Sequence, residues 1–109
     1  MALVQYIIVR TDLKFSKGAL AVNIAHASVA AIYKSINSED TQNYLKDTEN
    51  MTKIALKVGS EEELRAVFVN IQDRSYMWVE QPENVPVAIA TFPTNRTSFP
   101  QLKGLKLFS

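Results

Sequence analysis

The sequence predicts an α/β fold, namely a single three-layer domain whose mixed sheet of four to five strands has helices on both faces. A length of 109 residues suits one domain with one core and is too short for two. Segments rich in β-branched and aromatic residues alternate with segments of helical periodicity, a pattern typical of layered α/β domains. Two extended segments near the end of the chain then follow each other without a helix, which indicates that some strands pair antiparallel. We therefore expect residues 1–109 to form one unit.

The first two elements are predicted to be a strand over 4–9 and a helix over 18–35. "VQYIIV" is rich in β-branched and aromatic residues, as expected for a largely buried strand. The second segment is rich in alanine, which favours helix. Helical spacing places four apolar residues on one stripe and four others, two of them polar, on a neighbouring stripe. The stripes are Leu20, Ile24, Ala27 and Ala31, and Asn23, His26, Ala30 and Tyr33.

The middle of the chain predicts a short helix, a strand and a second long helix. Ser38 is a candidate N-cap for a helix through Leu45, because acidic residues suit its first turn. Residues 51–58 alternate between apolar and polar, which predicts a half-exposed strand. In "SEEELRAVFVNI", Ser60 and Glu63 have the spacing of a capping box, which marks the start of a helix. The acidic first turn suits the helix dipole, so we interpret it as structural.

The last third of the chain predicts two adjacent strands and an irregular tail. "YMWVE" at 76–80 and "VPVAIAT" at 85–91 read as strands joined by the polar connection "QPEN". A weak, proline-interrupted helix is expected within 94–102. The alternation in "LKLF" indicates a closing strand.

Composition excludes several classes of site and of protein. The chain has no cysteine and a single histidine, which excludes disulfides, thiolate catalysis, cysteine-based zinc sites and multi-histidine metal sites. The longest apolar stretch, 18–33, contains polar residues and is too short to span a membrane. No basic region precedes the apolar run of "MALVQYIIVR", so no export signal is expected. We expect a cytoplasmic protein without a membrane partner and without a metal.

Charge is unevenly distributed although the whole chain is balanced. The first 34 residues carry three more basic than acidic side chains, and residues 60–80 carry three more acidic than basic ones. A basic segment of this kind attracts anions such as a phosphate backbone, although solvated surface charge is the more common explanation.

A candidate anion site lies at the start of the first long helix. Free backbone N–H groups and the helix dipole favour negative charge at such a point. Lys17 and Gly18 occupy it, and the preceding loop supplies Arg10, Asp12 and Lys14. The spacing matches neither a Walker A loop nor a dinucleotide fingerprint, which excludes nucleotide binding through those devices.

Each candidate residue also has a plain structural explanation. A histidine in an alanine-rich helix is often buried and bonded to a backbone carbonyl, and on spacing alone this is the better interpretation of His26. Asn23 fits an ordinary surface residue equally well, and Lys17 fits a solvated lysine. Glu80, at the end of its strand, is either a general base or a strand-end charge.

Two motifs give the chain a family resemblance. "VRTDL" followed by "SKGALAVNIAHA" resembles the start of the archaeal and eukaryotic type of peptidyl-tRNA hydrolase, and "MTKIALKVGSEEEL" is similar to that family's second strand and third helix. The resemblance covers nearly the whole chain. "WVEQPEN" and "LKLF" are more narrowly similar to the subgroup called peptidyl-tRNA hydrolase domain-containing protein 1.

The resemblance implies hydrolysis of the ester between a peptide and tRNA, without a cofactor or metal. It implies a tRNA or peptidyl-tRNA partner and a homodimer. Such chemistry needs an activated water, an oxyanion donor and cations for phosphates. The implied catalytic residues are Lys17, Asn23, His26 and Glu80, with Asn23 standing where the family has glutamine. The implied substrate-binding residues are Arg10, Asp12, Lys14, Gly18 and Asn84, with Arg10 and Asp12 expected to form a salt-bridged pair.

The stretch between the strands predicted at 76–80 and 85–91, where the family has its second motif, departs most from the family pattern. "EQPENVPV" is shorter than the family pattern, Glu80 stands roughly for its aspartate, and neither of its threonines has a match. Val87 falls about where the last threonine stands and has no hydroxyl. Losing one donor in an acyl-transfer site costs about 2.7 to 4 kcal/mol of barrier. The alternative is therefore a catalytically weak or inactive homologue that binds tRNA or protein.

Overall fold

A six-stranded mixed sheet forms the middle layer of the structure, a computed structural model that describes residues 2–109. The strand order is β3-β4-β1-β2-β6, with β5 beside β1 off this path. β1 and β2 pair parallel, and every other pairing is antiparallel. The strands are β1 (Leu3–Arg10), β2 (Thr52–Val58), β3 (Ser75–Glu80), β4 (Val85–Thr91), β5 (Thr94–Asn95) and β6 (Lys106–Leu107).

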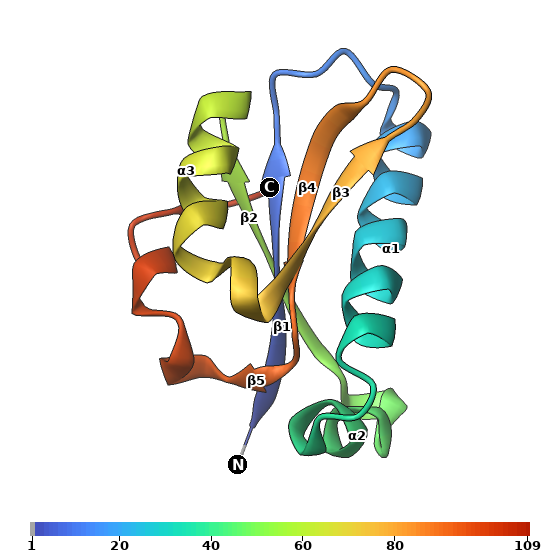
Figure 1. Cartoon of the computed structure of the whole chain (residues 1–109), viewed down its shortest axis with the longest axis vertical. Helices are drawn as coiled ribbons and strands as arrows, with labels where there is room; N and C mark the ends of the chain where they lie inside the picture. The colour runs from blue at the N-terminus through green and yellow to red at the C-terminus, as the bar shows by residue number, and fades with distance from the viewer. Residues whose placement is uncertain (1) are drawn as a thin grey trace.

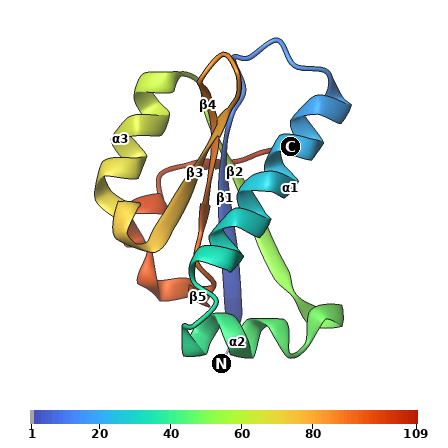
Figure 2. The same cartoon turned by 45° about the vertical axis from the view of Figure 1, so that its right-hand side comes forward.

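Helices cover both faces of this sheet, which confirms the predicted three-layer α/β architecture. α1 (Lys17–Lys34) lies on one face and α3 (Glu61–Ile71) on the other (Figure 1). The short α2 (Glu39–Leu45) follows α1 at the lower end of the molecule (Figure 2). Four 3₁₀ turns complete the chain, at Thr48–Asn50, Gln72–Arg74, Arg96–Ser98 and Pro100–Leu102.

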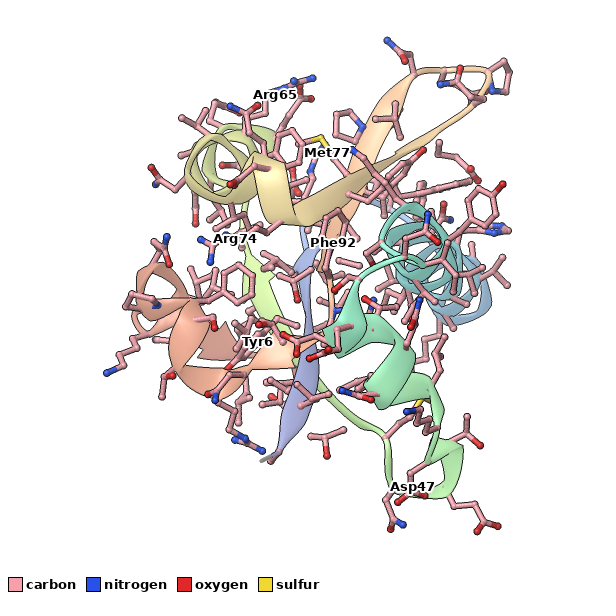
Figure 3. All side chains as sticks on the ribbon, turned by 60° about the horizontal axis from the view of Figure 1, so that its bottom comes forward. Tyr6, Asp47, Arg65, Arg74, Met77 and Phe92 are labelled. Atoms are coloured by element: carbon pink, nitrogen blue, oxygen red, sulfur yellow. The ribbon has the colours of Figure 1, made fainter. Side chains whose placement is uncertain are left out.

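Each face of the sheet buries its own apolar cluster. The cluster under α3 includes Ile8, Leu56, Leu64, Ile71 and Ile89, and the cluster under α1 includes Ile7, Val9, Ala27, Ala31 and Val87. Consecutive residues of a strand point to opposite faces. On β3, Met77 points toward α3 (Figure 3), whereas Trp78 packs against the α1 cluster.

Serine caps mark where the two long helices begin, and of these only Ser60 was predicted from the sequence. The Ser16 hydroxyl accepts a 3.1 Å hydrogen bond from the Ala19 N–H, and the Ser60 hydroxyl accepts one of 3.1 Å from the Glu63 N–H. Each bond satisfies a backbone donor that the first helical turn leaves free. Ser38 is the N-cap of α2 as predicted, but its side chain makes no capping hydrogen bond.

A buried polar network joins α1 to the centre of the sheet. Gln5 is fully buried, and its amide donates to the backbone carbonyls of Ser28 (3.2 Å) and Thr91 (3.1 Å). Its amide oxygen accepts from the Ser28 hydroxyl and the Lys53 ammonium, both at 2.7 Å. The side chain thus uses both donors and both acceptor sites. Because α1, β1, β2 and β4 all contribute, the network fixes α1 against the sheet.

The tail follows its prediction only in part, because the expected proline-interrupted helix within 94–102 forms as two separate 3₁₀ turns. β5 and two 3₁₀ turns occupy this stretch, so the sheet has one strand more than expected. Tertiary contacts anchor the segment: Arg74 lies 4.4 Å from the centre of the Phe99 ring and donates to the Ser98 carbonyl at 2.9 Å, and the Tyr6 ring meets Phe99 edge-on. Figure 3 labels Tyr6 and Arg74. Among residues 2–109, no helix has the length and apolar character needed to cross a membrane.

Candidate active site

Lys17 and Gly18 lie exposed in the first turn of α1. A Cβ added to Gly18 would meet no heavy atom within 4 Å, so the surface over this turn is open. Acidic side chains are absent from the turn, which leaves the positive end of the helix dipole uncompensated by the helix's own residues. The start of α1 and the β3–β4 connection both lie at the upper end of the molecule (Figures 1 and 2).

Arg10 and Asp12 form the predicted salt-bridged pair. Nε and Nη2 of Arg10 donate to the two carboxylate oxygens of Asp12 at 3.0 and 2.8 Å. Nη1 donates to the Pro86 carbonyl at 2.9 Å and lies 3.6 Å from Glu61. The guanidinium, hydrogen-bonded to Asp12, holds the pKa of that carboxyl below its usual value, and Asp12 raises the pKa of Arg10. The pair ties the loop before α1 to β4 and α3, while Lys14 stays exposed on that loop.

Asn23 and His26 meet at one aromatic residue, Trp78 of β3. The indole Nε1–H donates a 2.8 Å hydrogen bond to Oδ1 of Asn23, and Nδ2 of Asn23 donates one of 2.8 Å to the Ala19 carbonyl. The His26 ring stacks on the indole, with centroids 4.6 Å apart and planes 23° apart. Trp78 therefore orients Asn23 and His26, two of the polar side chains that interrupt the apolar helix.

Glu80 is the last residue of β3, and Asn84 lies in the connection to β4. Glu80 pairs with Val85 across the hairpin, and Val85 packs against the α1 cluster. Residues opposite each other in an antiparallel pair point to the same face, so the Glu80 side chain is directed to the face that α1 covers. Asn84 has a φ of 62°, a left-handed conformation that asparagine tolerates, and its side chain accepts a 3.2 Å hydrogen bond from Gln81. Asn84 thus shapes the turn that follows Glu80.

The candidate residues on α1 form two groups. Lys17 and Gly18 lie in the first turn, and Asn23 and His26 lie further along the helix, at Trp78. Lys17 precedes His26 by nine residues, so their Cα atoms lie about 13 Å apart at a rise of about 1.5 Å per residue. Lys17 lies at the end of the molecule where β3 ends at Glu80, and no ion pair joins these two among residues 2–109. A cavity of about 500 Å³ at the carboxyl ends of β1 and β2 is lined by other residues, including Thr11, Lys57 and Glu63.

Two of the plain structural explanations are wrong. His26 is exposed rather than buried against a backbone carbonyl. Asn23 is only 3% exposed, so it is not a surface residue. Val87, which is expected to fall about where the family has its last threonine, is fully buried in the cluster under α1.

Trp78 is the residue that the sequence analysis missed. Two signals in the sequence point to it: it is the only tryptophan in the chain, and it lies two residues before Glu80. A buried asparagine in an apolar helix also needs a hydrogen-bond partner. Pairing that partner with a residue 55 positions away required the fold. Within the described residues, no group of three or more His, Asp or Glu side chains is arranged to hold a metal ion.

Sequence comparisons match this chain to known proteins over almost its full length. The family model described as Peptidyl-tRNA hydrolase PTH2 matches residues 3–108. The mouse and human (Mus musculus, Homo sapiens) proteins PTRHD1, whose names give them as candidate peptidyl-tRNA hydrolases, are each 32% identical over 115 residues, which cover 97% of this chain and 82% of theirs. The peptidyl-tRNA hydrolase of Staphylothermus marinus is 36% identical over 85 residues, which cover 78% of this chain and 63% of its own. The chain therefore belongs to the peptidyl-tRNA hydrolase PTH2 family.

Proposed function

We propose that this protein is a cytoplasmic peptidyl-tRNA hydrolase, which cleaves the ester between a peptide, or a blocked amino acid, and tRNA without a metal or cofactor. The observation that carries the proposal is the position of Lys17. This lysine matches the family motif and lies exposed at the open N-terminal turn of α1, at the same end of the molecule as Glu80. A cation at the positive end of a helix dipole favours a developing oxyanion or a phosphate.

Glu80 acts as the general base in this proposal. Water attacks the ester carbonyl while the Glu80 carboxylate takes its proton, Lys17 stabilises the oxyanion, and the proton then passes to the departing ribose oxygen. His26 was the other candidate base. Its separation of about 13 Å from Lys17 along α1 favours Glu80, since base and oxyanion donor must act on the same ester.

The remaining predicted residues hold this arrangement or bind the substrate. Arg10 and Asp12 fix the loop that leads into Lys17, and their bond to the Pro86 carbonyl joins it to the β3–β4 hairpin. Lys14, exposed on the loop, suits a tRNA phosphate. Asn84 fixes the turn after Glu80, and the open surface at Gly18 leaves room for the ester.

Turnover of a model peptidyl-tRNA by the purified protein tests the proposal. An N-blocked aminoacyl-tRNA is incubated with the wild-type chain, and release of the blocked amino acid is compared with release in buffer alone. Release above background that rises in proportion to protein concentration supports the proposal. Release equal to background at a tRNA concentration that saturates binding would contradict it.

A second candidate function, a tRNA-binding module without catalysis, is favoured by one observation. Val87 is fully buried and has no hydroxyl, so this chain lacks a donor at the point where the family has its last threonine. Salt-sensitive tRNA binding without turnover would identify such a module, because phosphate contacts weaken steeply with ionic strength.

The homodimer implied by the family resemblance is also retained as a proposal. Sedimentation equilibrium of the wild type over a range of protein concentrations tests this proposal. We expect a dimer whose share rises with concentration, and a monomer at every concentration would contradict it.

A further inference from the structure

The stack of His26 on Trp78 has no role in the hydrolytic step proposed above. Its imidazole is exposed, although histidine rings that only fill space are usually covered. We propose that the outer face of the His26 ring, backed by Trp78, is the stacking platform for the terminal nucleobase of the single-stranded RNA end of the substrate. This inference rests on the proposed function, because it assigns the RNA side of the same site.

The platform is rigid before any ligand arrives. The Trp78 indole is held by its hydrogen bond to Asn23, which is itself 3% exposed and bonded to the Ala19 carbonyl. The indole in turn supports the imidazole across 4.6 Å. A ring that is already oriented loses little conformational entropy when a second aromatic plane stacks on it. The arrangement Asn23–Trp78–His26 thus presents one flat, accessible face.

The charges around the platform favour a polyanion. The two lysines of α1, Lys17 and Lys34, lie one at each end, and the helix has no acidic residue. Lys34 lies 5.7 Å from the centre of the Tyr76 ring, two residues before Trp78 on the same face of β3. Single-stranded nucleic acids bind where aromatic side chains lie between basic ones, because bases stack and phosphates pair.

Trp78, which backs the platform, and Glu80 lie on the same strand at a spacing close to the length of one nucleotide. Glu80 follows Trp78 by two strand residues, which correspond to about 7 Å. A terminal base and the ester on its own ribose belong to the same nucleotide, so they too lie within a single nucleotide's length. A base on His26 would therefore leave its ester near Glu80. Lys17, with its long flexible stem, would approach that ester from the start of α1.

Fluorescence of Trp78 tests the platform directly, because it is the only tryptophan of the chain. A five-nucleotide single-stranded RNA is titrated into the full-length protein at low salt, in parallel with the same RNA lacking its 3′-terminal base. We expect the intact RNA to change the Trp78 emission and to bind about tenfold tighter than the abasic RNA, as the stacking of one base predicts.

Three variants give the proposal its controls. His26→Ala should bind both RNAs equally, and His26→Phe should restore the preference for the intact RNA by supplying a flat ring. Tyr33→Ala removes a ring that is 78% exposed near the far end of α1 and should keep the preference. A wild type that binds the two RNAs equally, or a His26→Ala variant that keeps the preference, overturns the proposal. So does the absence of RNA binding together with a dimer that His26→Ala weakens, which would make the stack part of a protein interface.

The same experiment distinguishes this inference from the proposed function. A preference for the intact RNA in a protein that releases no blocked amino acid would support the platform and contradict the hydrolase function. Turnover by the wild type with no effect of the terminal base on affinity would support the hydrolase function and contradict the platform.

Discussion

The indole N–H of Trp78 donates a 2.8 Å hydrogen bond to Oδ1 of Asn23, and this bond joins the edge strand β3 to α1. It explains why an apolar helix carries an asparagine: the amide accepts from the indole and donates to its own helix at Ala19. The next turn then brings His26 onto the indole. One aromatic residue thus couples the face of α1 to the strand that ends in Glu80.

Replacing Trp78 with phenylalanine should destabilise the fold by about 1 to 3 kcal/mol, because it leaves the buried Asn23 oxygen without its partner. The free energy of unfolding in urea measures this loss. The double variant with Asn23→Ala should lose less than the sum of the two single variants, since both remove the same bond. Strictly additive losses would show that the bond contributes nothing of its own.

The Arg10–Asp12 pair should make the free energy of unfolding fall as the pH is lowered into the acid range. The pKa of Asp12 is lowered in the folded state by the Arg10 hydrogen bonds, so the unfolded chain takes up the proton first as the pH falls below about 4. The stabilisation is present above the unfolded pKa and is lost as the pH falls through the folded one. Asp12→Asn should be less stable than the wild type at pH 7, by up to about 1 kcal/mol for this half-exposed carboxylate.

Urea unfolding of both proteins between pH 7 and pH 2 checks this prediction. The difference between wild type and Asp12→Asn should shrink over the acid part of this range. A difference that stays constant to pH 2 would mean that the carboxylate is not held by Arg10.

Lys53 should make the protein more stable as the pH rises in the alkaline range. Partial burial lowers the pKa of Lys53 from its usual 10.5, so the folded protein releases the proton before the unfolded chain as the pH rises. Stability of the wild type relative to Lys53→Met should therefore increase as the pH rises toward 10.5. Thermal unfolding of the two proteins between pH 8 and pH 10.5 measures it, and Tyr44, which Lys53 approaches, is present in both. A relative stability that falls over this range would contradict the lowered pKa.

The order of elements could be predicted from the sequence because its signals are local. The alternation in β2, the Ser60 cap of α3 and the alanine stripe of α1 each follow from residues within one or two turns of each other. The tail could not be predicted in this way. β5 has two residues, too few for any periodicity, and the turns after it are held by Arg74 and Tyr6, which come from distant parts of the chain.

The candidate site likewise combines features that nearby residues predict with contacts between distant parts of the chain. Arg10 and Asp12 are two residues apart, and their salt bridge was expected from the family resemblance of the motif that contains them. The partner of Asn23 lies on another layer of the fold, and the exposure of His26 depends on how far the stack on Trp78 covers its ring. Gln5, buried among four polar partners, gave no signal in an otherwise apolar strand.

Glu80→Gln should lower kcat for a model peptidyl-tRNA by about a hundredfold or more, since a positioned base contributes at least that much. Glu83→Gln, in the exposed part of the same connection, is the matched control and should leave kcat unchanged. Steady-state kinetics on both variants gives the comparison. Equal loss in the two variants would point to the hairpin's overall charge rather than to a base at Glu80.

Release of an N-blocked amino acid from tRNA by Lys17→Ala tests the account most directly, because the proposed chemistry depends on a cation at the start of α1. Lys46→Ala removes an exposed lysine at the C-cap of α2, at the opposite end of the molecule, and serves as its control. We expect Lys17→Ala to lower kcat by about 100-fold to 1,000-fold, as loss of one oxyanion donor does, with an unchanged melting temperature and with Lys46→Ala as active as the wild type. Turnover by Lys17→Ala at the wild-type rate would contradict the account.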